Sequence, residues 1–291
     1  MMEITVKNNN KELKYSLEIF PPKTVKEVDS LIKKLKSMNS QPEFISVTYG
    51  AGGSTQNATL DLVTCLHKET NIDVAAHLTC VNSSIDDVIG LVELYGKVGI
   101  KKIVALRGDP PEGLGVPYRP YKSGFKNTAD LVRNIKKVND FDIYVAGYPE
   151  MHPESLDKKR DLDTLESKVK AGAHSIITQF FFDNELYYDY IKTLKKRNIT
   201  IPIIPGIIPI INFNQIKKFS DKCGASIPKD ISYDFLNSSG ADISDYNLCK
   251  KIIIKQITDL INNGVKNFHL YSLNRIQLMG NIWDDVLNQN L

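Results

Sequence analysis

An apolar run that begins at Lys102 ends abruptly in a cation, a glycine and a carboxylate, Arg107, Gly108 and Asp109. An apolar strand that delivers polar groups to one point is typical of α/β enzymes, whose chemistry gathers at the carboxyl ends of the strands. A cell-adhesion tripeptide is a weak alternative, because it would need an exposed loop in a secreted protein and the chain shows no secretion signal. A structural ion pair between Arg107 and a neighbour is the stronger alternative.

Glu18 is the most informative acid in the sequence. It lies between Leu17 and Ile19 in an apolar run that Pro21 and Pro22 terminate. Burial in such a setting favours the protonated carboxyl group, which suits a general acid, a role typically worth about 10² to 10⁴ in rate. The alternative is a carboxylate paired with a nearby arginine or lysine, which would favour the ionised form. The residues alone leave both interpretations open.

Polar residues stand at or just after the ends of most of the expected strands. A bias toward one end favours a single site over unrelated structural hydrogen bonds. The residues are Glu18, Thr48, Tyr49, His77, Arg107, Gly108, Asp109, Tyr148, Glu150, His152, Gln179, Asn274 and Arg275.

His77 could in principle bind zinc, but no partner ligand stands at i+2 or i+4 and no cysteine pair lies nearby. A hydrogen-bonding role is therefore favoured, and we expect no metal site. The remaining histidines His67, His174 and His269 have no site context and are interpreted as structural.

One expected helix carries Asp161, Thr164 and Lys168 at i, i+3 and i+7, which places them on one face. An ordinary solvated face explains this spacing as well as a ligand does. The aromatic run at 180–182 is interpreted as packing of the barrel and its helices.

Eight apolar runs rich in β-branched and aromatic residues predict strands. They span 15–20, 43–49, 74–80, 102–107, 142–148, 175–182, 201–208 and 267–273. Helical periodicity predicts helices at 25–38, 57–69, 85–98, 128–138, 156–171, 185–197, 213–223 and 246–263. Several of these begin after capping residues and end on glycine or asparagine. The caps are Thr24, Ser84, Asp183, Asn212 and Asp245, and the ends are Gly99, Gly172, Asn198 and Gly264.

This unbroken alternation predicts the α/β class and a closed (β/α)8 TIM barrel that forms a single domain. We expect one catalytic domain over 1–291, with an N-terminal extension at 1–13 and an insertion at 226–244 before the last helix and strand. No GxGxxG fingerprint follows the first strand, so any nucleotide cofactor must be held in another way.

Charge and cysteine usage exclude several classes of protein. The 37 basic and 34 acidic residues nearly cancel, so charge does not indicate nucleic acid or membrane as a partner. The four cysteines form no CxxC pair, which argues against a zinc knot or a disulfide framework. No run reaches the length of a membrane span, and we expect a cytoplasmic protein.

Eight motifs in register closely resemble those of the bacterial methylenetetrahydrofolate reductases. They are LEIFPPK at 17–23, VTYGA at 47–51, AHLTC at 76–80, ALRGD at 105–109, YPEMHP at 148–153, TQFFFD at 178–183, IPGI at 204–207 and FHLYSLNR at 268–275. That family is a flavin-containing (β/α)8 barrel, which agrees with the fold predicted above.

The resemblance implies a ping-pong reaction. NADH or NADPH reduces a non-covalently bound FAD and leaves, and 5,10-methylenetetrahydrofolate then accepts the hydride and becomes 5-methyltetrahydrofolate, which supplies methyl groups for methionine synthesis. The implied partners are folate and NAD(P)H, with no nucleic acid and no membrane. A homo-oligomer, dimer or tetramer, is expected.

The resemblance also implies roles for single residues. Glu18 matches the general acid that protonates folate N10, and Asp109 matches a carboxylate beside the flavin that contacts the pterin and tunes the flavin potential. The implied folate contacts are Gln179, Gln215, Phe219 and Arg275. The implied cofactor contacts are Thr48, Tyr49, Ala51, His77, Arg107, Gly108, Asp109, Thr128, Tyr148, His152, Asp161 and Lys168. Among these, Arg107 and Lys168 suit the pyrophosphate.

Some stretches depart from the family pattern. The loop at 110–126 is longer than usual, Asn127 and Thr128 stand where a tyrosine and an alanine often lie near the flavin, and Thr164 and Ser167 differ from the usual helix residues. These departures affect the expected FAD affinity and nucleotide access. The chain ends soon after the last expected strand, so we expect no separate regulatory domain.

Two other functions stay open at this stage. A metal-dependent lyase or aldolase would use His77, Asp109, Glu150 and His152 as ligands. A non-catalytic or partner-dependent subunit would bind folate or flavin but take electrons from another protein. The sequence does not determine the choice between NADH and NADPH, the oligomeric state or the physiological direction of the reaction.

Overall fold

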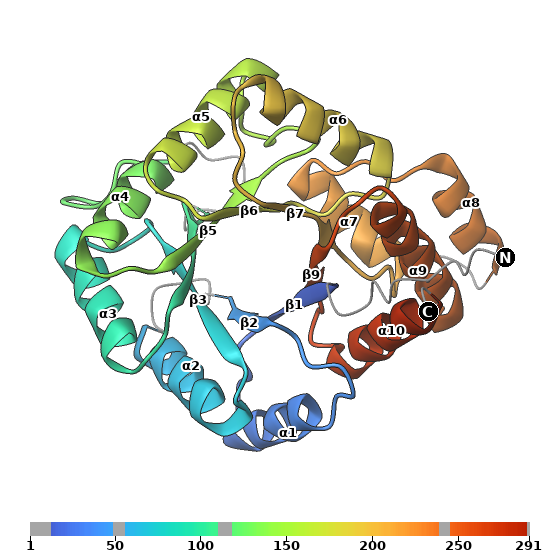
Figure 1. The fold of residues 1–291 in the computed structure, drawn as a ribbon, viewed down its shortest axis with the longest axis horizontal. Coiled ribbons are helices and arrows are strands. Elements are labelled where there is room, and N and C mark those ends of the chain that lie inside the picture. Colours follow the sequence, from blue (N-terminus) through green and yellow to red (C-terminus); the bar gives the residue numbers. More distant parts are fainter. Residues whose placement is uncertain (1–12, 49–55, 110–117, 239–244, 290–291) are drawn as a thin grey trace, which may run out of the picture.

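The computed structural model describes residues 13–48, 56–109, 118–238 and 245–289. In these residues, parallel strands stand in a ring with helices outside it (Figure 1). The strands are β1 (Lys14–Ile19), β2 (Phe44–Val47), β3 (Asp73–Thr79), β4 (Lys102–Leu106), β5 (Asp142–Gly147), β6 (Ser175–Thr178), β7 (Ile203–Ile204), β8 (Gly206–Ile207) and β9 (Asn267–Tyr271). The helices are α1 (Val25–Lys36), α2 (Gln56–Thr70), α3 (Ile85–Lys97), α4 (Thr128–Val138), α5 (Lys158–Lys170), α6 (Asn184–Lys196), α7 (Phe213–Cys223), α8 (Lys229–Ser238), α9 (Tyr246–Asn262) and α10 (Ile276–Gln289).

The strands pair in the order β7-β6-β5-β4-β3-β2-β1-β9-β8, and each pairing is parallel. Because β7 and β8 follow one another along the chain, the two ends of this order meet and the ring closes. The predicted (β/α)8 barrel is therefore confirmed. Parallel strands need a crossover between them, and the helices supply it on the outer side.

The seventh strand differs from the prediction, because the expected run at 201–208 divides into β7 and β8. Pro205 has no N–H to donate to a ladder. Its carbonyl accepts a hydrogen bond from the His269 amide (3.0 Å), while the Gly206 amide donates to Thr178 Oγ1 (2.9 Å). A Cβ at Gly206 would lie 2.3 Å from the Thr178 carbonyl oxygen, so this close approach requires glycine. The divided strand joins the β6 side of the barrel to the β9 side.

Successive residues of each strand point to opposite faces of the sheet and pack in two different apolar clusters. Residues such as Leu17, Ile45 and Leu270 belong to the main core, which also contains the buried faces of the helices. A separate apolar cluster contains residues of strands alone and fills the barrel interior. Its buried members are Phe44, Ala75, Val104, Tyr144, Ile177 and Ile204. Glu18 alternates with Leu17 and Ile19, both in the main core, so its side chain points to the barrel interior.

The predicted helix ends are confirmed where the structure describes them. The side chains of Thr24, Ser84, Asp183, Asn212 and Asp245 each accept a hydrogen bond from a first-turn amide. At the other ends, the left-handed positions are taken by Gly99, Gly172, Asn198 and Gly264. Local chemistry therefore fixed the helix limits well.

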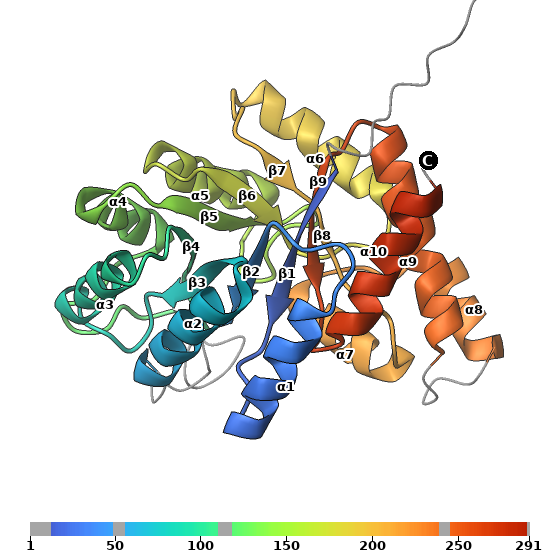
Figure 2. The same ribbon diagram turned by 60° about the horizontal axis from the view of Figure 1, so that its bottom comes forward.

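Three helices depart from the prediction. The 226–244 insertion contains α8, where Ile231 and Phe235 are buried at i and i+4, and α10 follows the last expected strand. In the outer ring of helices, α9 lies between α6 and α10 (Figure 1). The helix expected as the seventh of the ring, α7, lies instead at the end of the barrel where β1 and β9 finish (Figure 2). Its apolar residues Phe213 and Ile216 pack in a cluster with α8 that is separate from the main core.

Candidate functional site

Glu18 stands at the end of β1 between two imidazoles from other strands. Its Oε2 lies 3.6 Å from His77 Nε2 on β3 and 3.8 Å from His269 Nε2 on β9. The Glu18 side chain is 16% exposed, so it remains within reach of a ligand. Among the described residues, no lysine or arginine forms an ion pair with it. The paired-carboxylate alternative therefore has no cation to support it, and we call Glu18, His77 and His269 the acid group.

His77 is an uncharged member of this group at neutral pH. Burial lowers the pKa of His77 to about 4, although the carboxylate of Glu18 opposes the shift. The contact with Glu18 is thus not an ion pair between full charges. His77 Nε2 is buried and, within the described residues, has no hydrogen-bond partner. A buried polar atom without a partner is typical of a position that a ligand completes.

His269 is a member that sequence reasoning missed. Its Nδ1 lies 2.7 Å from Ser16 Oγ, which orients the ring, and the β1–β9 register pairs the same two residues. The sequence contained a signal for this residue. Ser16 and Glu18 stand two positions apart on the first expected strand, as His269 and Tyr271 do on the last. Reading both strands with a period of two would have placed all four on the inner face.

The end of β4 carries a second, charged group. Arg107 forms a bidentate pair with Glu154, through Nη1 (2.5 Å) and Nη2 (3.0 Å), and its Nε donates to the Gly108 carbonyl (3.2 Å). Hydrogen bonding raises the pKa of Arg107 and lowers the pKa of Glu154. The ion pair that the sequence analysis weighed against a functional role is thus present. A bidentate pair uses two of the guanidinium's five N–H groups, which leaves others for an anion.

Gly108 and Asp109 complete the end of this strand. Gly108 has a φ of +83°, and a Cβ there would lie 2.7 Å from a methyl carbon of Val81. Only glycine fits this turn. Asp109 is exposed at the limit of the described segment.

The helix after β5 contributes two buried charges. Asp161 and Lys168 are both buried, whereas Thr164 is exposed, so a solvated face, one of the two explanations left open above, does not account for Asp161 and Lys168. Lys168 Nζ donates to the Ala146 carbonyl (2.7 Å). Burial lowers the pKa of Lys168 to about 8 and raises the pKa of Asp161. We call Arg107, Glu154, Asp161 and Lys168 the cation group.

Aromatic rings connect the two groups. Tyr148 lies edge-on to His152 with ring centroids 4.6 Å apart, and Glu154 donates its amide to His152 Nδ1 (3.1 Å). Tyr271 donates its hydroxyl to the Thr178 carbonyl (2.8 Å). Burial raises the pKa of Tyr271, with further contributions from Glu18 and Tyr148.

The other predicted residues lie nearby or outside the described segments. Gln179 is half-buried after β6, with its side-chain oxygen accepting from the Phe180 amide (3.0 Å). Phe219 on α7 is 41% exposed and stacks on Phe180 at 5.5 Å between centroids. Gln215 and Arg275 are exposed. Elsewhere, Thr48 is half-buried after β2 and Thr128 is buried at the start of α4, while Tyr49 and Ala51 lie outside the described residues.

Comparison with known proteins decides which family this barrel represents. The family model described as methylenetetrahydrofolate reductase matches residues 3–286. The chain is 41% identical over 281 residues to the 5,10-methylenetetrahydrofolate reductase of Buchnera aphidicola subsp. Schizaphis graminum, covering 95% of this chain and 93% of that one. It is 38% identical to the enzyme of the same name from Escherichia coli, covering 92% and 88%. The chain belongs to the methylenetetrahydrofolate reductase family.

The family indicated by the sequence motifs is thereby confirmed. A solved structure with a TM-score of 0.65 covers 98% of this chain and 97% of its own, at 17% identity. It is described as an uncharacterized protein from Clostridium thermocellum that binds two copies of 5-methyl-5,6,7,8-tetrahydrofolic acid. At this identity the likeness supports the fold alone.

The metal-dependent alternative lacks its ligand set in this member of the reductase family. In the segments that the structure describes, no group of three or more His, Cys, Asp or Glu side chains is arranged so that it could hold a metal ion. Of the four proposed ligands, Glu150 is hydrogen-bonded by Ser226, and His152 Nδ1 accepts from the Glu154 amide. These two side chains already have protein partners.

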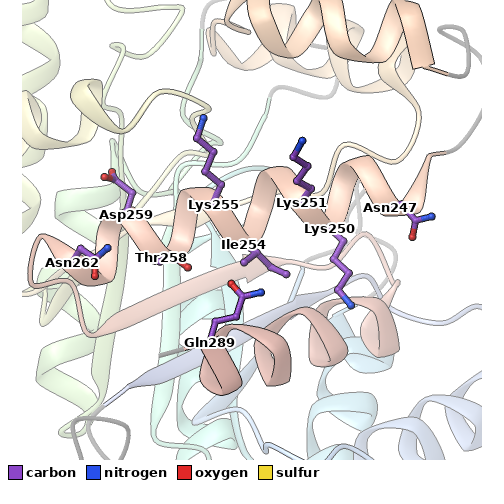
Figure 3. A pocket seen from close by; sticks show the side chains of 9 residues that line it. All are labelled: Asn247, Lys250, Lys251, Ile254, Lys255, Thr258, Asp259, Asn262 and Gln289. Atoms are coloured by element: carbon purple, nitrogen blue, oxygen red, sulfur yellow. The ribbon is translucent and has the colours of Figure 1, made fainter. Parts of the chain in front are cut away.

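A cavity of about 650 Å³ lies away from the barrel mouth, on the outer surface along α9 (Figure 3). Its lining includes Lys250, Ile254, Thr258 and Gln289 and none of the site residues predicted from the sequence. Lys250 is paired with Asp285 on α10 (2.5 Å). This cavity belongs to the packing of the outer helices. None of the helices in the described residues combines the length and apolar character needed to cross a membrane.

Proposed function

We propose that this protein reduces 5,10-methylenetetrahydrofolate to 5-methyltetrahydrofolate, with FAD as a non-covalent cofactor and NADH or NADPH as the electron donor. The observation that carries the proposal is the position of Glu18, a partly shielded carboxyl group between two imidazoles at the mouth of a barrel of this family. A ping-pong order follows if both substrates use this mouth in turn, and the product would supply methyl groups for methionine synthesis.

Several observed features fit a flavin dinucleotide. Arg107 and the buried Lys168 offer cations to a pyrophosphate, and Gly108 allows the backbone to approach a ligand closely. The unpartnered Nε2 of His77 offers a polar contact in the barrel interior. When bound, FAD would accept a hydride from the nicotinamide and pass it to the folate.

The remaining cofactor contacts are assigned by family membership together with position. Asp161 is a member of the cation group and Tyr148 and His152 adjoin it, while Thr48 follows β2 and Thr128 begins α4. We assign Tyr49 and Ala51 to the cofactor as well, although they lie outside the described residues. Asp109 is assigned to the flavin and the pterin, where a negative charge disfavours an anionic reduced ring.

Glu18 is assigned the proton transfer. Glu18 faces the uncharged imidazole of His77, and among the described residues no lysine or arginine forms an ion pair with it. In the proposed reaction it gives its proton to folate N10, which opens the five-membered ring and leaves an electrophilic iminium carbon for the hydride. Proton donation by a positioned side chain is a step that general acids accelerate strongly.

Folate recognition is assigned to four side chains around α7 and the last strand. Phe219 presents an exposed ring for stacking, and Gln179 and Gln215 offer amides that can pair with a pterin edge. Arg275 is an exposed guanidinium suited to the carboxylates of the folate tail.

The deciding experiment follows the flavin through both half-reactions. Purified protein should show the yellow absorbance of oxidised flavin, lose it when NADH or NADPH is added without oxygen, and regain it when methylenetetrahydrofolate follows. A colourless protein that takes up no added FAD would contradict the proposal. A flavin that only a separate redox protein can reduce would favour the partner-dependent alternative instead. We also propose a dimer or tetramer, which light scattering after size exclusion would test.

A further inference from the structure

Helix α7 is fastened to the barrel mouth by an unusual contact at its C-terminal end. The carboxylate of Glu150, in the loop between β5 and α5, accepts the Ser226 amide at 3.0 Å from both oxygens and also the Ser226 hydroxyl. The two residues are 76 positions apart in the chain. One side chain thus joins the segment after α7 to the loop after β5.

A second contact supports the same junction. Gly224 ends α7 in the left-handed region with a φ of +72°, and a Cβ there would lie 3.0 Å from Pro153 and 3.4 Å from the Met151 carbonyl oxygen. Met151 itself has a φ of +82°, which is uncommon for a residue with a side chain. The chain at 224–226 therefore packs closely on the loop at 150–153.

Apolar packing attaches the rest of α7 to the barrel mouth. Its buried residues Phe213 and Ile216 belong to a cluster that contains residues of α8 and also residues just after β6 and β8, and Phe219 stacks on Phe180. The helix lies at the end of the barrel and is not part of the outer ring of helices (Figure 2). Its buried residues therefore do not belong to the main core. The Glu150 contact adds a polar link just beyond the C-terminal end of the helix.

This junction joins two elements with different proposed ligands. The β5–α5 loop carries Tyr148 and His152, assigned above to the cofactor, whereas α7 carries Gln215 and Phe219, assigned to folate. We propose that Glu150 is a positioning residue that holds α7 against the cofactor loop and thereby sets the affinity for the folate substrate. This inference rests on the proposed function.

The expected signature is a change in KM without a change in kcat. Phe219 and Gln215 would bind the folate equally in the ground state and the transition state, and loss of such uniform binding raises KM alone. Hydrogen bonds to a charged acceptor are stronger than neutral ones, so Glu150→Ala should raise the KM for methylenetetrahydrofolate about tenfold. Glu150→Gln keeps one acceptor oxygen and should restore part of the affinity.

The test measures the steady-state constants and both half-reactions in Glu150→Ala, Glu150→Gln, Ser226→Ala and the Glu150→Ala/Ser226→Ala double variant. FAD content and the rate of flavin reduction by NAD(P)H should match wild type in each. The double variant should be no worse than Glu150→Ala, because both changes remove the same contact. Asp221→Asn is the matched control, since that carboxylate pairs with Lys217 within α7 itself.

Hydrogen exchange supplies a readout that needs no ligand. Amides at 213–226 should exchange faster in Glu150→Ala than in wild type, and Asp221→Asn should not share this change. An active wild type with unchanged KM and unchanged exchange in the Glu150 variants would overturn the inference, as would additive effects in the double variant. Faster exchange in a protein that binds no flavin would support the fastening of α7 and reject the proposed function instead.

Discussion

The acid group and the cation group, on two sides of the barrel mouth, differ in how their buried ionisable side chains are stabilised. The acid group has one carboxyl group and two imidazoles, and the buried imidazole of His77 stays neutral because burial lowers its pKa to about 4. In the cation group, Arg107 keeps its charge and pairs in bidentate fashion with Glu154, whereas burial lowers the pKa of Lys168 to about 8. Burial of a charge is tolerated when a partner offsets it, and otherwise the proton equilibrium moves.

This difference suits two tasks at one opening. A proton donor works best where no fixed cation holds it ionised, whereas phosphate binding needs cations that stay charged. Separate strands supply the two environments, β1, β3 and β9 for the first and the ends of β4 and β5 with α5 for the second. The comparison shows that the positions of the charged partners on the strands separate the proposed proton donor from the proposed phosphate-binding cations. Three experiments test this separation.

The largest effect should come from Glu18→Gln. Without an exchangeable acidic proton, folate reduction should fall by about 10² to 10⁴. Flavin reduction by NAD(P)H should stay within about twofold, since the amide keeps the size of the side chain and that half-reaction needs no general acid. Rapid-mixing absorbance of each half-reaction makes the measurement, with Glu43→Gln, an exposed carboxylate just before β2, as the control. Equal losses in both half-reactions would contradict the assignment of Glu18.

The next effect concerns pH and the neutral imidazole. The pKa of His77 is about 4 in the folded protein against 6.5 ordinarily, so the unfolded chain takes up a proton that the folded chain refuses. The free energy of unfolding therefore does not depend on this group above pH 6.5. It falls as the pH is lowered from 6.5 toward 4, by about 3 kcal/mol in all.

Urea unfolding over this pH range, in wild type and His77→Gln, measures the contribution. The variant should lose less stability on acidification, because glutamine has no proton to take up. The comparison uses the slope against pH, so that a general loss of packing in the variant does not affect it. Parallel slopes would mean that His77 is not held neutral by burial.

A smaller effect should follow Lys168→Met. Loss of one buried cation should weaken FAD binding about 10- to 100-fold, the range for a charge-assisted hydrogen bond. Because the pKa of Lys168 is about 8, its ammonium group loses its proton as the pH rises through that value. Wild-type FAD affinity should therefore fall as the pH rises past 8.

Flavin fluorescence titrations at several pH values check this expectation. Lys170→Met is the matched control, because that lysine lies on the same helix, is 75% exposed and pairs with Glu166. The control should bind FAD as wild type does. A similar loss in both variants, or a pH dependence that survives Lys168→Met, would place the phosphates elsewhere.

Much of the fold was predictable from local patterns. Caps such as Thr24 and Ser84 work through residues three positions away, so the sequence predicted them correctly. Missed features have other causes. Helix α10 has apolar residues at helical spacing, from Ile276 to Val286, that the prediction left unassigned. The break at Pro205 arises because the strand must reach both β6 and β9, which no local pattern records.

The candidate site divides in the same way. Glu18 drew attention because its chain neighbours are apolar, but its partners His77 and His269 come from distant strands. The position of α7 off the ring was not predictable from its amphipathic pattern, because a helix that packs on the barrel mouth and one that packs on the barrel side have the same periodicity. The partner of Arg107, 47 residues later, was likewise invisible.

The sequence by itself determined the alternation of strand and helix, the helix caps and the residue types available at each strand end, because these depend on neighbours within one or two turns. Only the tertiary structure decided that Ser16 meets His269, 253 residues away, that His77 is neutral and that Glu154 binds Arg107. The reason is physical: desolvation and charge pairing depend on what lies within a few ångströms, and closure of the barrel sets those distances between residues that the chain keeps far apart.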